Sequence, residues 1–390
     1  MIRSSKRFFA AVFALLFVFV TLPAMNVFAA EYDQHDVEKL RSFFELVSFF
    51  GDKNGKSING NGYSPDDPST WSKSCTWDET TGKLKKFSMT NHGSWVTGVL
   101  DLEGFTGLTT VVVQDCYIDG IVLTGCAALS YLDLSGDNLE EVSVADCTEL
   151  ESLLVRENKF TSIDLANNTK LKVIDVFENK LTSLDLSVCT ELTKLNCQRN
   201  QLTELDLSHN LKLKELEIRT NLLTSVDISM LTELKVFNSR ANRLTSVDLS
   251  VLNGGESFIL DTQPGGYIGT YFSWVGVDTY SPCVSYAAIE GYTFLGWYSD
   301  GELLSTENHF PVTFGEGAKH ITAHFMMLGD LDRSGDVTAA DALLLLRYAM
   351  GIITADEIDI NAANVNGDDT IDAADALIVL RYAMGIITGF

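Results

Sequence analysis

The chain has 390 residues and carries 53 acidic against 28 basic side chains, which gives a net charge of −25 at pH 7. So large an acidic excess argues against a protein whose main partner is nucleic acid or an anionic membrane surface, because both would repel it. The length allows for two to four modules.

Residues 1–30 have the pattern of a secretory signal peptide. Basic residues near the start precede an apolar run that ends at Leu22, and Ala29 and Ala30 follow as small residues at the expected cleavage point. No later apolar run reaches the roughly 18–20 residues needed to span a bilayer. We therefore expect a secreted, extracellular protein without a membrane span, held in place through its partners.

Residues 31–84 are predicted to form an N-terminal helical cap. The apolar residues of 31–50, which include Leu40 and Val47, follow helical spacing and predict an amphipathic helix. The Gly- and Asn-rich stretch 51–62 is interpreted as a turn. A cap is expected here because the first coil of the repeats that follow would otherwise expose its core.

Residues 85–255 contain a repeat with a period of 21 residues. Alternating apolar residues over unit positions 3 to 7 predict a short strand with positions 4 and 6 inward. Position 9 is Asn in five of the seven units, and its amide can bond the backbone of the neighbouring coil. The first position of each unit is a leucine: Leu108, Leu129, Leu150, Leu171, Leu192, Leu213 and Leu234.

This unit resembles the leucine-rich repeat family, and the resemblance implies a solenoid of seven 21-residue repeats. A unit this short leaves little room for a helix on the convex side, so extended segments or single turns are expected there. Cys126 and Cys147 occupy the same apolar position in adjacent coils. We interpret them as buried free thiols, and a disulfide between them stays open as an alternative.

The concave strand face, at unit positions 3, 5 and 7, is where a ligand is expected. Three apolar residues there step diagonally across neighbouring strands, and arginines lie near them. Such a group is typical of a protein-binding surface, and scattered exposed apolar residues are an equally weighted interpretation. This repeat patch comprises Tyr131, Leu154, Arg156, Phe177, Arg199, Arg219 and Arg240.

In residues 256–327 the period stops, and Gly, aromatic and β-branched residues predict a small β-rich module. The stretch that begins at Gly291 resembles small β repeats of bacterial surface proteins, including internalin-like ones, and this resemblance implies a spacer. Aromatic residues of the module are interpreted as its core. Carbohydrate binding through Trp274, Trp297 or Tyr298 is the alternative.

Residues 328–390 contain one segment twice, 34 residues apart. Each copy is a twelve-residue loop with oxygen-bearing side chains at positions 1, 3, 5, 9 and 12 and a backbone carbonyl at position 7, a spacing that can wrap Ca²⁺. Gly335 stands at position 6 of the first loop, but Asp369 stands there in the second, so a left-handed Asp and a weaker site are expected. The predicted ligands of two Ca²⁺ ions are Asp330, Asp332, Ser334, Asp336, Thr338 and Asp341, then Asn364, Asn366, Asp368, Thr370, Asp372 and Asp375.

A loop followed by a helix, twice, with Asp closing both loops, resembles the type I dockerin family. The resemblance implies an all-α, calcium-binding module that binds a cohesin module of a scaffoldin, as in a cell-surface cellulosome. In that family, partner choice is associated with loop positions 10 and 11 and the helix after them. Carried over to this chain, the cohesin-binding residues are Ala339, Ala340, Leu346 and Arg347, with Ala373, Ala374, Leu380 and Arg381 in the second copy. Their near identity suggests docking in two orientations.

The sequence contains no nucleophile elbow, zinc motif or phosphate loop, and its six histidines are scattered. We therefore expect no enzymatic activity. The expected function is a non-catalytic secreted protein that the dockerin-like region anchors to a scaffoldin and whose repeats bind a protein. Two alternatives stay open: adhesion to polysaccharide or cell wall, and an enzyme with an unrecognised site.

Overall fold

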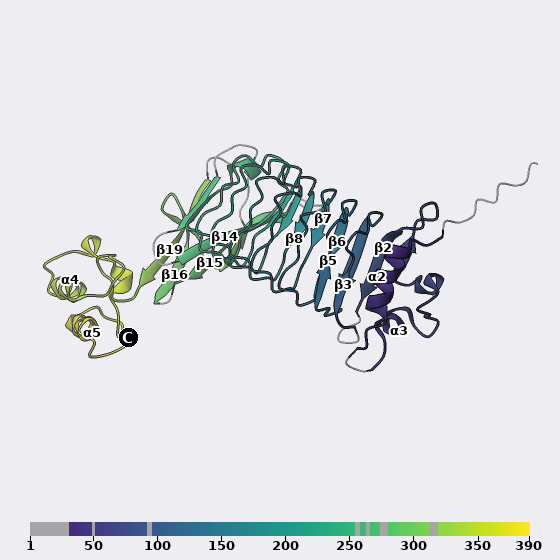
Figure 1. The fold of residues 1–390 in the computed structure, drawn as a ribbon. Helices are drawn as coiled ribbons and strands as arrows, with labels where there is room; N and C mark the ends of the chain where they lie inside the picture. The colour runs from purple at the N-terminus through teal and green to yellow at the C-terminus, as the bar shows by residue number, and fades with distance from the viewer. Residues whose placement is uncertain are drawn as a thin grey trace, which may run out of the picture.

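The computed structural model describes residues 31–48, 51–91, 96–253, 258–262, 266–273, 280–289, 291–311 and 319–390. The predicted signal peptide and Trp274 lie outside these residues. A helical cap, a stack of coils, a β-rich end and a pair of helices follow one another along the molecule (Figure 1). No helix within the described ranges is both long and apolar enough to cross a membrane.

The α-helices of the described residues are α2 (Gln34–Phe44), α3 (Asn54–Asn59), α4 (Ala339–Ala349) and α5 (Ala373–Ala383). The strands are β1 (Cys75–Trp77), β2 (Leu84–Thr90), β3 (Val99–Asp101), β4 (Thr110–Gln114), β5 (Gly120–Val122), β6 (Tyr131–Asp133), β7 (Ser152–Leu154), β8 (Val173–Asp175), β9 (Lys194–Asn196), β10 (Glu215–Glu217), β11 (Val236–Asn238), β12 (Ser246–Asp248), β13 (Phe258–Thr262), β14 (Gly266–Ser273), β15 (Tyr280–Ala288), β16 (Tyr292–Ser299), β17 (Glu302–Ser305), β18 (His309–Pro311) and β19 (Lys319–Met327).

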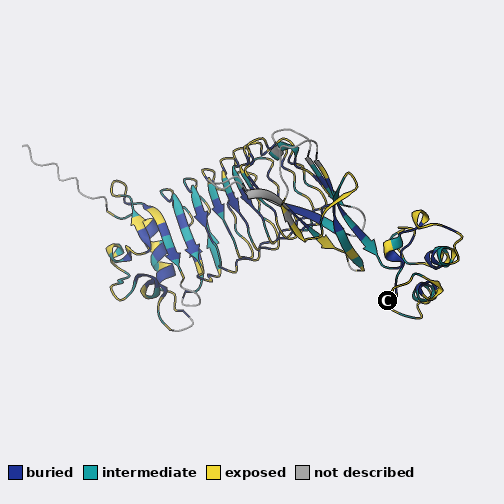
Figure 2. Ribbon diagram, turned by 180° about the vertical axis from the view of Figure 1, so that it is seen from behind, coloured by how far each residue is buried: buried dark blue, intermediate teal, exposed yellow. Residues whose placement is uncertain are grey.

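The 21-residue units form a solenoid, as predicted. Strands β6 to β11 pair in parallel, and each residue lies opposite the one 21 positions later, so that Leu132 pairs with Leu153. Unit position 4 faces the core in every coil, and Leu132, Leu153 and Ile174 have no exposed surface. Buried residues recur along the stack (Figure 2). The fold is therefore a leucine-rich repeat solenoid.

The predicted asparagine ladder is confirmed. Asn179 accepts a hydrogen bond from the Phe160 amide at 3.0 Å and donates one to the Val155 carbonyl at 2.8 Å, both in the preceding coil. The residue before each ladder asparagine has a left-handed backbone, which turns the chain so that the amide points inward. These left-handed residues are Glu157, Glu178, Arg199, Thr220 and Ala241, and the asparagines are Asn158, Asn179, Asn200, Asn221 and Asn242.

The N-terminal cap differs from the prediction in two places. Helix α2 ends at Phe44, so Val47 is not on its apolar face but 58% exposed. The chain turns back there because Asn54 is buried and its amide donates to the Phe43 carbonyl at 3.0 Å. The stretch interpreted as a turn contains the short helix α3.

The β-rich stretch continues the solenoid sheet. Strand β14 pairs antiparallel with β11, and β15 and β18 follow, which extends the sheet to 12 strands among the described residues. A five-stranded sheet has the order β12-β13-β19-β16-β17, and β3 and β5 pair as a separate two-stranded sheet. The pairing of β14 with β11 occupies the hydrogen-bonding edge that the last coil would otherwise leave open. Trp297 is fully buried, as expected for a core residue.

Cys126 and Cys147 are free, buried thiols, and the other four cysteines whose side chains the structure describes are buried as well. Burial raises the pKa of Cys126 to about 11 and that of Cys147 to about 12. A thiol with so high a pKa is a poor nucleophile. These cysteines therefore serve as apolar core residues.

Candidate calcium loops and repeat patch

The first predicted calcium loop begins just after strand β19. The carboxylates of Asp330, Asp332 and Asp341 converge there, with oxygen atoms within 4.8 Å of one another. Burial raises the pKa of Asp330, and the neighbouring charges of Asp341 and Asp332 raise it further. A hard divalent cation would relieve this repulsion, so the residues of the first loop fit Ca²⁺.

The aspartate at position 12 accepts hydrogen bonds from backbone amides in both loops. Asp341 accepts from the Leu331 amide at 2.8 Å and from the Thr338 amide at 2.8 Å. Asp375 likewise accepts from the Val365 amide at 3.1 Å and the Asp372 amide at 3.0 Å. Each of these aspartates completes a capping box at the start of the helix that follows. The loop and the helix are thus fixed by one buried side chain.

The second loop has a different backbone from the first, and the expectation of a left-handed Asp369 is wrong. Gly335 at position 6 of the first loop has φ of 93°, whereas Asp369 at position 6 of the second loop is not left-handed. Position 4 is left-handed in both loops, at Arg333 and at Gly367. The Asn364 side chain explains the difference, because it accepts from the Gly367 amide at 2.9 Å and donates to the Asp368 carbonyl. Local hydrogen bonds of the Asn364 side chain thus shape the second loop.

Replacing Gly335 by alanine is expected to weaken calcium binding in the first loop by about 10-fold, because a left-handed backbone costs an L-residue about 1–2 kcal/mol. A calcium titration of the full chain measures this affinity. Gly389→Ala is the matched control, since Gly389 lies outside both loops with open space around it. An unchanged affinity in Gly335→Ala would contradict the expected role of this turn.

Helices α4 and α5 share one core and present matching outer surfaces. Leu345 and Val379 have no exposed surface and belong to the same apolar cluster. Among the predicted cohesin-binding residues, Leu346 and Leu380 are half-buried against that cluster. The exposed ones are Ala339, Ala340, Arg347, Ala373, Ala374 and Arg381. Their role stays a prediction.

Sequence reasoning missed a second duplicated set of exposed residues, all of them apolar. They form three pairs, and the members of each pair are 34 residues apart. An apolar residue that recurs at the same place in both copies, outside the inward helical face, was the available signal. The pairs are Leu343 and Leu377, Met350 and Met384, and Ile352 and Ile386, which are 50–63% exposed.

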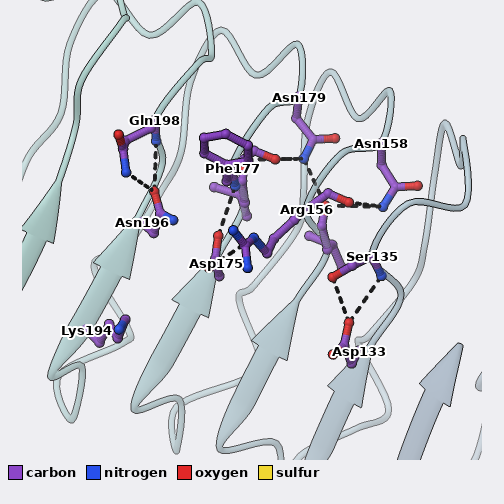
Figure 3. Close-up of polar contacts among 12 residues, drawn as sticks. Asp133, Ser135, Arg156, Asn158, Asp175, Phe177, Asn179, Lys194, Asn196 and Gln198 are labelled. Carbon is purple, nitrogen blue, oxygen red and sulfur yellow. Dashed lines mark hydrogen bonds and ion pairs between the residues drawn. The ribbon is translucent and has the colours of Figure 1, made fainter. Parts of the chain in front are cut away.

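Within the predicted repeat patch, Phe177 lies between two arginines. The guanidinium carbons of Arg156 and Arg199 lie 5.4 and 5.5 Å from the centre of its ring. Arg156 also pairs with Asp175 at 3.5 Å (Figure 3), and Arg199 pairs with Glu178 at 2.8 Å. These contacts hold the aromatic ring and both cations in place on the strand face.

Of the remaining members of the patch, Tyr131 and Leu154 lie on β6 and β7, and Arg219 and Arg240 follow β10 and β11. Tyr131 and Leu154 are half-buried, Arg219 is exposed, and Arg240 donates to Asn238 at 3.3 Å. Sequence reasoning missed the polar residues at unit position 5, which include Asp133, Asp175 and Asn196 (Figure 3). Their shared position in the repeat was the signal that could have found them.

Residues 328–383 match the family model of the Dockerin type I domain. The C-terminal unit is a type I dockerin domain. Domains of this family generally bind calcium, in agreement with the converging carboxylates of the first loop. The dockerin is preceded by the solenoid and the β-rich stretch.

Three solved structures illustrate what the rest of the chain is similar to. The functional domain of InlJ from Listeria monocytogenes is 24% identical, with 56% of this chain and 54% of that chain covered and a TM-score of 0.41. An internalin, InlF, from the same organism is 26% identical over 38% and 46% of the two chains, with a TM-score of 0.35. A leucine-rich repeat protein of Leptospira interrogans is 19% identical over 37% and 49%, with a TM-score of 0.30. This chain spans about half the length of each. A search of curated proteins found no match.

Proposed function

We propose that this chain is a non-catalytic, secreted component of a cell-surface cellulosome. In this proposal the dockerin binds two Ca²⁺ ions and docks on a cohesin module of a scaffoldin, while the solenoid binds another protein. The dockerin family match supports the first part. The strongest support for docking on a protein comes from the matching outer surfaces of α4 and α5, because a duplicated, partly apolar surface is suited to a protein partner.

The duplicated surface predicts that either copy alone supports cohesin binding. Ala340→Arg and Ala374→Arg each place a bulky side chain on one copy, so each single variant should bind within a few-fold of the parent. The double variant should lose binding by more than about 100-fold. Binding of the full chain to a panel of cohesins, with CaCl₂ or with EGTA, measures this effect.

The matched control is Ala355→Arg, at an exposed position between the two helices and outside both surfaces. It should bind like the parent. Loss of binding in one single variant would show that a single orientation is used. Equal binding with CaCl₂ and EGTA would remove calcium from the docking step.

A protein ligand is proposed for the solenoid because Phe177 lies between two arginines on its strand face. Aromatic and arginine side chains dominate the hot spots of protein interfaces. Retention of the full chain on insoluble polysaccharide, lost in Phe177→Ala, would favour the alternative of a cell-wall adhesion component. Hydrolysis of such a substrate by the full chain would instead make it an enzyme.

A further inference from the structure

The asparagine ladder is interrupted near the start of the solenoid. Cys116 and Asp137 occupy the ladder position in the first two units. There the residue after the ladder position, Tyr117 or Asn138, is also left-handed, with φ of 54° and 61°. The backbone therefore takes a different path where the asparagine is missing. Non-glycine residues with a left-handed backbone are concentrated at functional sites.

The coils that do carry asparagine show what the ladder position requires. The Asn158 oxygen accepts from the Leu139 amide at 2.8 Å. Its nitrogen donates to the carbonyls of Leu134 at 2.7 Å and Arg156 at 3.0 Å. The position thus requires one acceptor atom and one donor atom. An ionised aspartate has two acceptors and no hydrogen to donate.

Asp137 satisfies half of this requirement. Its side chain is 1% exposed, and one carboxyl oxygen accepts from the amides of Cys116 at 2.7 Å and Tyr117 at 3.0 Å. The other oxygen is buried and has no hydrogen-bond partner. By the 21-residue repeat, the carbonyls that correspond to the two acceptors at Asn158 are those of Val113 and Ser135.

We propose that Asp137 carries a proton in the folded solenoid, and that its O–H supplies the donor that asparagine supplies in the other coils. A neutral carboxyl can accept with one oxygen and donate with the other, as an amide does. A buried charge without a partner for the second oxygen would be costly. The first coils of the solenoid are therefore less stable at a pH where this proton is lost.

The surroundings of Asp137 favour the proton. Burial raises its pKa to about 7, from 3.8 in a free aspartate, and the charges of Asp115 and Asp133 raise it further, against the two amide donors. The fold therefore binds one more proton than the unfolded chain between these two values. The contribution of Asp137 to stability is therefore greatest below pH about 4, falls as the pH rises to about 7, and stays low above it.

Asp137 also lines a groove of about 1000 Å³ on the side of the solenoid. The left-handed residues Tyr117 and Asn138 line the same groove. The protonation state of Asp137 therefore affects the conformation of the loops that line the groove. The charged side chains of the groove are Asp119, Asp137, Glu140, Glu141, Lys159 and Lys180.

The test compares Asp137→Asn with the parent chain by calorimetry at pH 4.5 and pH 8, with saturating CaCl₂ and, in a second series, with EGTA. We expect the solenoid transition of Asp137→Asn to rise by about 5 °C or more at pH 8 and by much less at pH 4.5. Hydrogen exchange at pH 8 should slow at the amides of Cys116 and Tyr117. Asn158→Asp is the reciprocal variant, and it should gain the pH dependence that Asp137→Asn loses.

Equal shifts at both pH values, or an Asp137→Asn chain less stable than the parent at pH 8, would overturn the proposal. So would a calcium-dependent gain in the solenoid transition at pH 8 that Asp137→Asn removes, because a cation, not a proton, would then neutralise the carboxylate. An Asn158→Asp chain without new pH dependence would show that the ladder position does not need a donor.

Discussion

Replacing Asp341 by alanine is expected to abolish calcium binding in the first loop and to reduce cohesin binding by more than about 100-fold. The carboxylate has no exposed surface and accepts from the backbone amides of Leu331, Asp332 and Thr338. Alanine would leave buried donors unpaired, at a cost of about 1–3 kcal/mol each, and remove the capping box of α4. Calorimetric calcium titration of the full chain, followed by cohesin binding, measures both effects.

The loss should spread beyond the first loop, because α4 and α5 share one core. The control Asp356→Ala changes an exposed aspartate between the two helices, outside both loops, and should bind calcium and cohesin like the parent. Two intact calcium sites in Asp341→Ala would refute the ligand assignment. Loss of calcium with full cohesin binding would separate the metal from the docking surface.

The second large effect is expected in the ladder, where Asn179→Ala should destabilise the solenoid by about 2–4 kcal/mol. The variant leaves the Phe160 amide and the Val155 carbonyl buried without their partner, and each buried orphan costs about 1–3 kcal/mol. The solenoid transition should fall by about 4 °C or more, which thermal unfolding monitored by circular dichroism measures.

Asn167→Ala is the matched control, since Asn167 is exposed and makes a single side-chain bond to the Ala145 carbonyl at 3.1 Å. Its transition should stay within about 1 °C of the parent, as for most surface changes. If Asn179→Ala were equally mild, the ladder bonds would be exchanged for water at little cost. The ladder would then define the coil without stabilising it.

Features that repeat along the chain were predicted well. The 21-residue period identified the strands, the inward positions such as Leu132 and Leu153, and the ladder residue Asn179. This is because equivalent positions in every coil have the same environment and therefore need the same residue types. The dockerin domain was recognised for a similar reason, since its two acidic loops repeat one spacing within twelve residues.

Features that depend on a neighbour distant in the chain were not predicted. Helix α2 ends at Phe44 because the Asn54 side chain donates a hydrogen bond to the Phe43 carbonyl. The helical spacing of the apolar residues does not predict that contact. The pairing of β14 with β11 likewise joins the β-rich stretch to the solenoid. Periodicity describes one element at a time, so it does not report which edge or face another element will cover.

Local patterns thus determined the solenoid and the dockerin domain, whereas tertiary contacts decided how individual side chains are used. The position of Phe177 between Arg156 and Arg199, from neighbouring coils, required the packed strands. The same holds for Asp137, whose ladder position the repeat shows but whose unpartnered oxygen appears only when the coils are stacked. Burial and hydrogen bonding are properties of the assembled coils, because each coil's polar groups are satisfied by the next.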